Sequence, residues 1–349
     1  MKSAIFWPPP LFLYFEYFAM YKGAIKVVAQ LKLWYNFLKK GKAFKQEEKY
    51  VVRVKVPATT ANIGPGFDCL GIAIDIYNTI EVEECDEGLY IEVVGQGCHE
   101  VPRDHTNLVY SSMQKVFDEV CYRPKGIRMT LTNDIPVARG LGSSAACIVG
   151  GMVAANALSG FRLGLHELMK LAVQVDGHPD NVVPALVGGM AAACLEGDEV
   201  LYVKMDPPPG IKLAVMIPDF ELSTSKARQV LPDAIPLKDV VFNISRTAIL
   251  VASFLTGRSE MLAVATQDRL HQPYRKALIP HWDDIFFYAG KWGAKGVFLS
   301  GAGPTIVAIL DEGNVTFIDK MKEAVSAFPE RWEIRMVDFC RSGVEVSHI

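Results

Sequence analysis

The segment Pro136-Val137-Ala138-Arg139-Gly140-Leu141-Gly142-Ser143-Ser144-Ala145-Ala146 is a glycine- and serine-rich turn that leads into a predicted helix over residues 143–158. Glycine lets the backbone approach a phosphate closely and adopt left-handed dihedral angles. The first turn of a helix adds unpaired N–H groups and the positive end of the helix dipole, which together bind anions. The segment therefore predicts a site for the phosphates of a nucleotide.

A plain loop that ends in a serine cap is the alternative interpretation of this segment, because Ser is a preferred N-cap residue. The segment is not a Walker A loop, since no Gly-Lys-Ser/Thr follows the glycines, and it lacks the GxGxxG pattern of dinucleotide-binding proteins. Taken by itself it indicates phosphate binding without indicating a family.

The composition is that of a folded protein of ordinary size. The chain has 349 residues, of which 50% are apolar and 21% are charged, and this length predicts about two domains. A net charge of −3 gives no bias toward nucleic acid, so we expect no nucleic-acid partner. The seven cysteines are scattered without a CxxC pair, which favours reduced thiols in a cytoplasmic protein and argues against a zinc site.

Residues 1–49 differ from the rest because they are rich in lysine and aromatic residues. They lack the roughly 20 uninterrupted apolar residues of a membrane span and an evident cleavage site for a signal peptide. Residues 23–40 place apolar side chains among lysines at near-helical spacing, which favours contact with a membrane surface. The other interpretation is a misassigned translation start, since Val51 or Val52 could be encoded by an alternative GTG start codon. We expect membrane contact only if the extension is genuine.

Strand and helix patterns alternate from residue 50 onward, which predicts an α+β fold. The linker signal Pro207-Pro208-Pro209-Gly210 divides this part into domains at 50–206 and 207–349. In the first domain the patterns predict strands at 50–56, 78–84, 90–94, 126–132, 186–194 and 199–204 and helices at 107–120, 143–158 and 165–175. In the second they predict strands at 212–217, 296–299, 305–310 and 331–337 and helices at 226–230, 240–255, 259–266, 282–288 and 317–328.

Two further motifs flank the opening segment in the chain. The first follows the first predicted strand and reads Val56-Pro57-Ala58-Thr59-Thr60-Ala61-Asn62-Ile63-Gly64-Pro65-Gly66-Phe67-Asp68, and the last reads Ser300-Gly301-Ala302-Gly303-Pro304-Thr305. In this order the three resemble the three motifs of the GHMP kinases, and the first resembles that of the homoserine kinase branch. The resemblance covers residues 50–349.

This resemblance implies a two-domain α+β fold, with an N-terminal domain like domain 2 of ribosomal protein S5 and a ferredoxin-like C-terminal domain. It implies ATP-dependent phosphorylation of the L-homoserine hydroxyl in threonine biosynthesis, with ATP and Mg²⁺ bound between the domains, and a homodimer. All residues from Pro136 to Ala146 would bind ATP, and Asn107 would lie near the adenine. Ser144 and Asp176 would hold Mg²⁺. Glu is usual at the second of these positions, and the shorter Asp favours a bridging water.

The resemblance also assigns the amino-acid side of the site. Homoserine is a zwitterion, and the planar fork of arginine binds carboxylates through two hydrogen bonds. Arg228 and Arg275 match the family's carboxylate clamps, with Arg269 as a competing choice for the second. The matching substrate residues are Asn62, Asp68, His178 and Asp180, and the matching catalytic residues are Asn62, Asp180 and Asn181.

No general base is evident, because mevalonate kinase-like relatives carry a lysine where this sequence has Thr59. We therefore expect catalysis by positioning and charge stabilisation, with Asp180 as general base the alternative. Two other functions stay open. One is a GHMP kinase for a different alcohol, and the other is a non-catalytic protein that binds a nucleotide or an amino acid.

Overall fold

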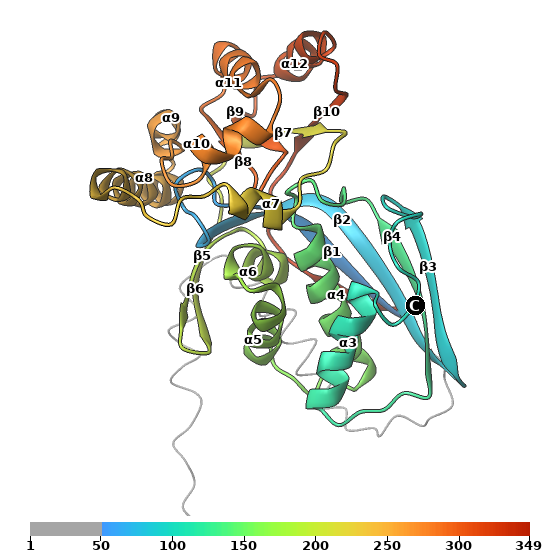
Figure 1. Ribbon diagram of the computed structural model, residues 1–349. Helices are drawn as coiled ribbons and strands as arrows, with labels where there is room; N and C mark the ends of the chain where they lie inside the picture. Colours follow the sequence, from blue (N-terminus) through green and yellow to red (C-terminus); the bar gives the residue numbers. More distant parts are fainter. Residues whose placement is uncertain (1–50) are drawn as a thin grey trace, which may run out of the picture. The chain divides into compact units, whose positions relative to one another are not determined.

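The computed structural model describes residues 51–349, shown as a coloured ribbon in Figure 1. The chain divides into two units, Met1–Lys49 and Tyr50–Ile349, and the whole of the following description concerns the second. Both expectations for residues 1–49 lie outside the described residues.

A seven-stranded sheet forms the first half of the fold. Its long central strand β2 (Leu70–Cys85) pairs with β1 (Val52–Ala61), with β4 (Gly126–Asn133) and, at its start, with β5 (Met190–Glu196). Only β3 (Gly88–Gly95) and β4 run parallel among the pairs of this sheet. The remaining two strands lie at edges and are β6 (Glu199–Met205) and β11 (Glu345–His348).

Four helices lie on one face of this sheet (Figure 1): α3 (Leu108–Glu119), α4 (Ser143–Leu158), α5 (Leu165–Asp176) and α6 (Pro179–Val187). Helix α4 is buried nearly all round, which explains why its sequence is apolar on every side. Its small residues allow close packing, since a Cβ added at Gly151 would lie 2.3 Å from the Val109 carbonyl oxygen of α3. This packing fixes the direction in which the first turn of α4 points.

The second half is a four-stranded antiparallel sheet. Its order is β10-β7-β9-β8, formed by β7 (Ile211–Pro218), β8 (Gly296–Leu299), β9 (Ile306–Asp311) and β10 (Trp332–Val337). This fourth-first-third-second order is that of ferredoxin-like folds. Helices α11 (Trp282–Lys291) and α12 (Phe317–Val325) lie beside it (Figure 1). The expected α+β fold class is therefore confirmed.

The connection between β7 and β8 carries the helices nearest the candidate site. They are α7 (Thr224–Gln229), α8 (Leu237–Thr256), α9 (Leu262–Ala265) and α10 (Gln272–Arg275), with 3₁₀ turns at Ser259–Met261 and Lys276–Leu278. Within residues 51–349, α8 is the one helix long and apolar enough to cross a bilayer, a criterion that some helices of soluble proteins also meet. Asn243 and Thr247 of α8 donate hydrogen bonds of 3.2 and 3.1 Å to the Pro65 carbonyl, so this helix packs against the loop that follows β1.

Strands β5 and β11 are among the elements that differ from the sequence-based expectation. The strand expected at 186–194 begins only at Met190, because the residues before it form α6, whose Pro184 and apolar run obscure the helical pattern. The short, exposed strand β11 was not expected. It pairs antiparallel with β1, with His348 opposite Val52, so the end of the segment assigned to the second domain adds an edge to the first sheet. The boundary at residues 207–210 stays a prediction.

Candidate active site

The turn before α4 has the backbone of an anion-binding loop. Gly140 and Gly142 have φ angles of 79° and 69°, which favour glycine. A Cβ at Gly142 would lie 1.9 Å from Thr59 Oγ1, and one at Gly140 would lie 2.4 Å from the Ser300 carbonyl oxygen. No side chain of residues 51–349 caps α4, and Ser144 is exposed. The N–H groups of its first turn are thus free to bind the phosphates of a nucleotide.

The third motif supports this loop from the end of the second sheet. Ser300 Oγ lies 2.5 Å from the Gly140 carbonyl oxygen and 2.8 Å from Thr60 Oγ1. The Thr305 N–H donates to the Arg139 carbonyl at 3.2 Å. The first, second and third motifs therefore meet around one turn.

Two side chains expected near ATP are occupied by the protein itself. The Arg139 guanidinium donates to the carbonyls of Pro218 (3.0 Å) and Asp219 (2.8 Å), which ties the loop to the end of β7. Asn107 is the N-cap of α3, where its Oδ1 accepts hydrogen bonds from the N–H groups of Val109 and Tyr110. The Arg139 side chain thus anchors the loop, and the Asn107 side chain caps α3. Contact with ATP stays a prediction only for the backbone of these two residues.

The first turn of α6 reaches the phosphate loop. The buried Thr59 hydroxyl donates to Asn181 Oδ1 at 2.7 Å, and Asn181 Nδ2 donates to Asp180 Oδ1 at 3.2 Å. A Cβ on Gly142 would lie 3.2 Å from the same Asn181 oxygen. Asp180 and Asn181 are therefore brought next to the turn at which phosphate is expected.

A charged cluster lies at the start of α6, around its N-cap residue His178. Arg228 Nη2 donates to both carboxylate oxygens of Asp68, at 3.0 and 3.2 Å, and lies 2.8 Å from His178 Nε2. Because arginine only donates, His178 Nε2 accepts, and burial lowers the pKa of His178, which favours the neutral ring. Nε and Nη1 of Arg228 have no hydrogen-bond partner within the part of the chain that the structure describes.

Two further carboxyl groups face this cluster. Burial raises the pKa of Asp176 to about 6, and burial together with the charges of Asp68 and Asp176 raises the pKa of Asp180 to about 7, although Arg228 opposes both shifts. A positive charge placed close to a buried carboxyl group favours its ionised form. Residues 51–349 contain no group of three or more protein ligands for a metal.

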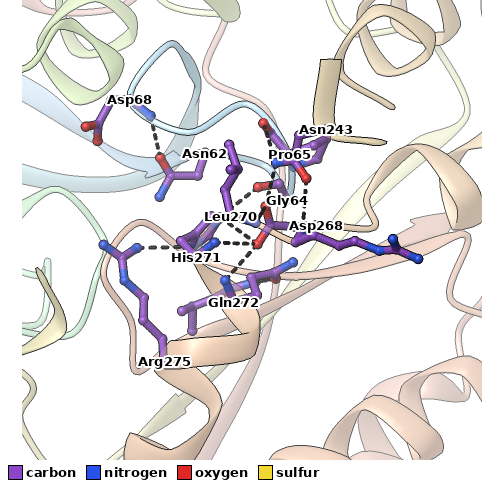
Figure 2. A network of polar contacts seen from close by, with 12 residues as sticks. Asn62, Gly64, Pro65, Asp68, Asn243, Asp268, Leu270, His271, Gln272 and Arg275 are labelled. Atoms are coloured by element: carbon purple, nitrogen blue, oxygen red, sulfur yellow. Dashed lines mark hydrogen bonds and ion pairs between the residues drawn. The ribbon is translucent and has the colours of Figure 1, made fainter. Parts of the chain in front are cut away.

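Arg275 is buried, and two of its three guanidinium nitrogens donate hydrogen bonds to the protein. Its Nε donates to the Ala227 carbonyl (3.1 Å), and its Nη1 donates to the Gly301 carbonyl (3.0 Å) and to His271 Nδ1 (3.2 Å), the last contact being drawn in Figure 2. Burial lowers the pKa of Arg275 to about 10, so it remains a cation at neutral pH. Only Nη2 is left for a ligand, which makes Arg228 the better candidate for a two-point carboxylate clamp.

Asn62 holds the turn of the first motif. It has a φ of 70°, its Nδ2 donates to the Gly301 carbonyl at 3.0 Å, and its Oδ1 accepts the Asp68 N–H at 2.9 Å. Figure 2 shows Asn62 directed toward the backbone of Asp68. The side chain thus orients Asp68, and the catalytic role expected for Asn62 stays a prediction.

Three site residues were not recognised from the sequence. Phe67 lies with its ring 5.3 Å from the Arg275 guanidinium and 5.6 Å from that of Arg228. Asp268 and His271 form the buried network beneath Arg275 (Figure 2). The available signal was the spacing of His271 and Arg275, which places them on one face of a helical turn.

Comparisons with known proteins agree with this geometry. Residues 107–189 match the family model for the GHMP kinases N terminal domain, and residues 250–327 match that for the GHMP kinases C terminal region. The chain is 51% identical to a homoserine kinase from Petrotoga mobilis over 296 residues, which cover 85% of this chain and 96% of the relative. It is 48% identical to a homoserine kinase from Caldicellulosiruptor saccharolyticus, with 85% and 96% covered.

Solved structures give the same result. A crystal structure of homoserine kinase from Cytophaga hutchinsonii aligns with a TM-score of 0.79 at 30% identity, covering 88% of this chain and all of that one. A mevalonate kinase structure aligns with a TM-score of 0.61 at 18% identity, covering 83% and 99%, and so supports the fold alone. The family expected from the three motifs is confirmed, and the chain belongs to the homoserine kinase family of the GHMP kinases.

Proposed function

We propose that this protein transfers the γ-phosphoryl group of ATP to the side-chain hydroxyl of L-homoserine, a step of threonine biosynthesis, and forms O-phospho-L-homoserine. One observation carries this function. The first turn of α6 contacts the phosphate loop through Thr59 and Asn181 and faces the Asp68–Arg228 pair. The first turn of α6 therefore lines both the expected phosphate site and the cluster of oppositely charged side chains.

The charges of this cluster suit a small zwitterion. The open edge of Arg228 and the Nη2 group of Arg275 would receive the carboxylate of homoserine. Asp68 and Asp180 would receive its ammonium group, which compensates the unfavourable proximity of the two carboxylates. In this orientation the hydroxyl of homoserine points toward Asn181 and the phosphate loop.

Phosphoryl transfer needs positioning and charge neutralisation more than covalent chemistry. The N–H groups at the start of α4 would bind the phosphates, and Ser144 and Asp176 would hold Mg²⁺, whose charge offsets that of the phosphates. We propose that positioning and charge stabilisation account for catalysis, with the hydroxyl proton leaving late. Asp180 as general base is the second candidate, supported by its pKa of about 7.

A panel of alcohols tests this function. ADP release would be measured with homoserine, mevalonate, shikimate and galactose, and mass spectrometry would identify O-phosphohomoserine. We expect kcat/KM to be highest for homoserine. Preference for another alcohol would indicate a different GHMP kinase, and binding of ATP without any phosphorylated product would indicate a non-catalytic protein.

We also propose a homodimer in the cytoplasm. Helix α8 exposes Leu237 (76% exposed), Val241 (56%) and Ile244 (64%), whose spacings of four and three residues are the pattern of helix pairing. Leu255 (64%) is also exposed, near the other end of the helix. Ile244→Lys should shift the protein to a monomer in sedimentation, whereas Ile244→Leu should not. A monomeric wild-type protein would refute the dimer.

All seven cysteines are free thiols, which supports the proposal of a reducing compartment such as the cytoplasm.

A further inference from the structure

The residues beneath Arg275 form a buried polar network that belongs to none of the three motifs. Asp268 accepts hydrogen bonds from the N–H groups of Leu270 (2.9 Å), His271 (3.0 Å) and Gln272 (2.7 Å) and from Asn243 Nδ2 (2.6 Å). Figure 2 shows this carboxylate at the centre of the contacts. The start of α10 is therefore fixed by one fully buried carboxylate.

His271 links this fixed turn to two parts of the site. Its ring is fully buried, with Nε2 2.7 Å from the Gly64 carbonyl oxygen and Nδ1 3.2 Å from Arg275 Nη1. The Phe67 ring stacks on it at 5.2 Å. One imidazole thus joins the turn of the first motif to the guanidinium that would bind the substrate.

The protonation of His271 follows from its two partners. Arginine has only donors, so Nδ1 must accept, whereas a carbonyl has only acceptors, so Nε2 must carry the proton. Both contacts are satisfied only by the neutral ring protonated at Nε2, since an imidazolium would direct a proton from Nδ1 at Arg275. Burial also lowers the pKa of His271, which agrees with this state.

We propose that His271, as a neutral imidazole protonated on Nε2, is a positioning residue that orients Arg275 and thereby sets the affinity for homoserine. The inference rests on the proposed function. Nε and Nη1 of Arg275 are bound to Ala227, Gly301 and His271, so the direction of its free Nη2 depends on these three acceptors. Of the three, only His271 provides a side chain.

Amide variants separate the two contacts of the ring. In His271→Gln the amide reaches the position of Nε2, which keeps a donor for Gly64 and removes the acceptor for Arg275. In His271→Asn the amide oxygen occupies the position of Nδ1, which keeps the acceptor. A net hydrogen bond corresponds to about a 2- to 12-fold change in an equilibrium constant. We therefore expect His271→Gln to raise the homoserine KM by about this factor and His271→Asn to restore most of the loss, with the ATP KM unchanged in both.

Gln272→Met is the matched control. Gln272 is the buried neighbour of His271 in α10, and its Oε1 accepts the Leu299 N–H at 2.7 Å. We expect this variant to lower the Tm without changing the homoserine KM selectively. If His271→Gln changes KM no more than Gln272→Met does, or raises the KM of both substrates equally, His271 is merely structural and the proposal is wrong.

Nitrogen-15 NMR of the imidazole provides a readout that does not depend on activity. The wild-type ring should show protonated Nε2 and unprotonated Nδ1 through about pH 6 to 8, the range in which an ordinary histidine titrates. The opposite tautomer, or an imidazolium, would overturn the proposal. A wild-type protein that shows the expected tautomer but does not phosphorylate homoserine would instead refute the proposed function and, with it, the effect on homoserine affinity.

Discussion

Replacing Arg228 by alanine tests whether this residue binds the carboxylate of homoserine. In the structure Arg228 uses Nη2 to bind Asp68 and His178 and leaves Nε and Nη1 open. A substrate carboxylate can therefore be bound without breaking the existing pair. The variant should lose the whole charge-assisted contact, which is worth about 1.5–3 kcal/mol, or roughly a 10- to 150-fold rise in the homoserine KM.

The ion pair with Asp68 adds little to this figure. The side chains of Arg228 and Asp68 are 36% and 27% exposed, and pairs of such exposure contribute at most about 1 kcal/mol. Loss of Arg228 should, however, raise the pKa values of Asp176 and Asp180 further, because its charge opposes both shifts. The variant should therefore need a higher pH than the wild type for its maximal kcat/KM.

Steady-state kinetics with both substrates and a thermal melt provide the assay. We expect the ATP KM to change little, because Arg228 makes no hydrogen bond to residues 136–146. Arg228→Lys is the control for charge, and it should recover only part of the affinity because lysine lacks the planar fork. A homoserine KM within twofold of the wild type, in a variant that melts normally, would remove Arg228 from the binding site.

Three further predictions concern the phosphate loop and the carboxylates. Gly142→Ala should raise the ATP KM by roughly 5- to 160-fold, because its Cβ would lie 1.9 Å from Thr59 Oγ1 and such a clash costs about 1–3 kcal/mol. Gly160→Ala has a similar φ with open space around the Cβ and should leave the ATP KM unchanged. Because the raised pKa of Asp180 is about 7, its carboxylate becomes protonated below that pH, and kcat/KM for homoserine should fall as the pH is lowered. Asp180→Asn should abolish this pH dependence along with most of the activity. Asp176→Glu should lower the Mg²⁺ concentration that gives half-maximal ADP release, since a longer side chain coordinates directly, and an unchanged requirement would exclude Asp176 as a ligand.

The sequence predicted those elements whose pattern is local. The helix at 143–158 was predicted with its observed bounds, because glycine precedes it and small apolar residues fill it. Helix α6 was missed because its nine residues contain Pro184 and an apolar run that resembles a buried strand. Strand β11 was missed because it is four exposed residues long, and only its pairing with β1, almost 300 residues away in the chain, makes it a strand.

The site shows the same limit. Three short motifs were sufficient to predict which segments meet around the turn before α4, because each motif is contiguous. They did not indicate that Arg139 and Asn107 serve the protein's own backbone, since those contacts depend on tertiary structure. The role of His271 depends on Gly64, 207 positions earlier in the chain, and no local pattern encodes that contact.

The balance of charge supports the proposal that two substrates and a divalent cation bind in one site. The cluster combines the carboxyl groups of Asp68, Asp176 and Asp180 with the guanidinium groups of Arg228 and Arg275. Homoserine adds one ammonium and one carboxylate, so it redistributes the charge of the cluster without neutralising it. Burial is the largest cause of the raised pKa values of Asp176 and Asp180, and the charge of Arg228 offsets it only in part. ATP would add more negative charge, so the proposed divalent cation beside Asp176 would allow both carboxylates to stay ionised while the phosphates bind.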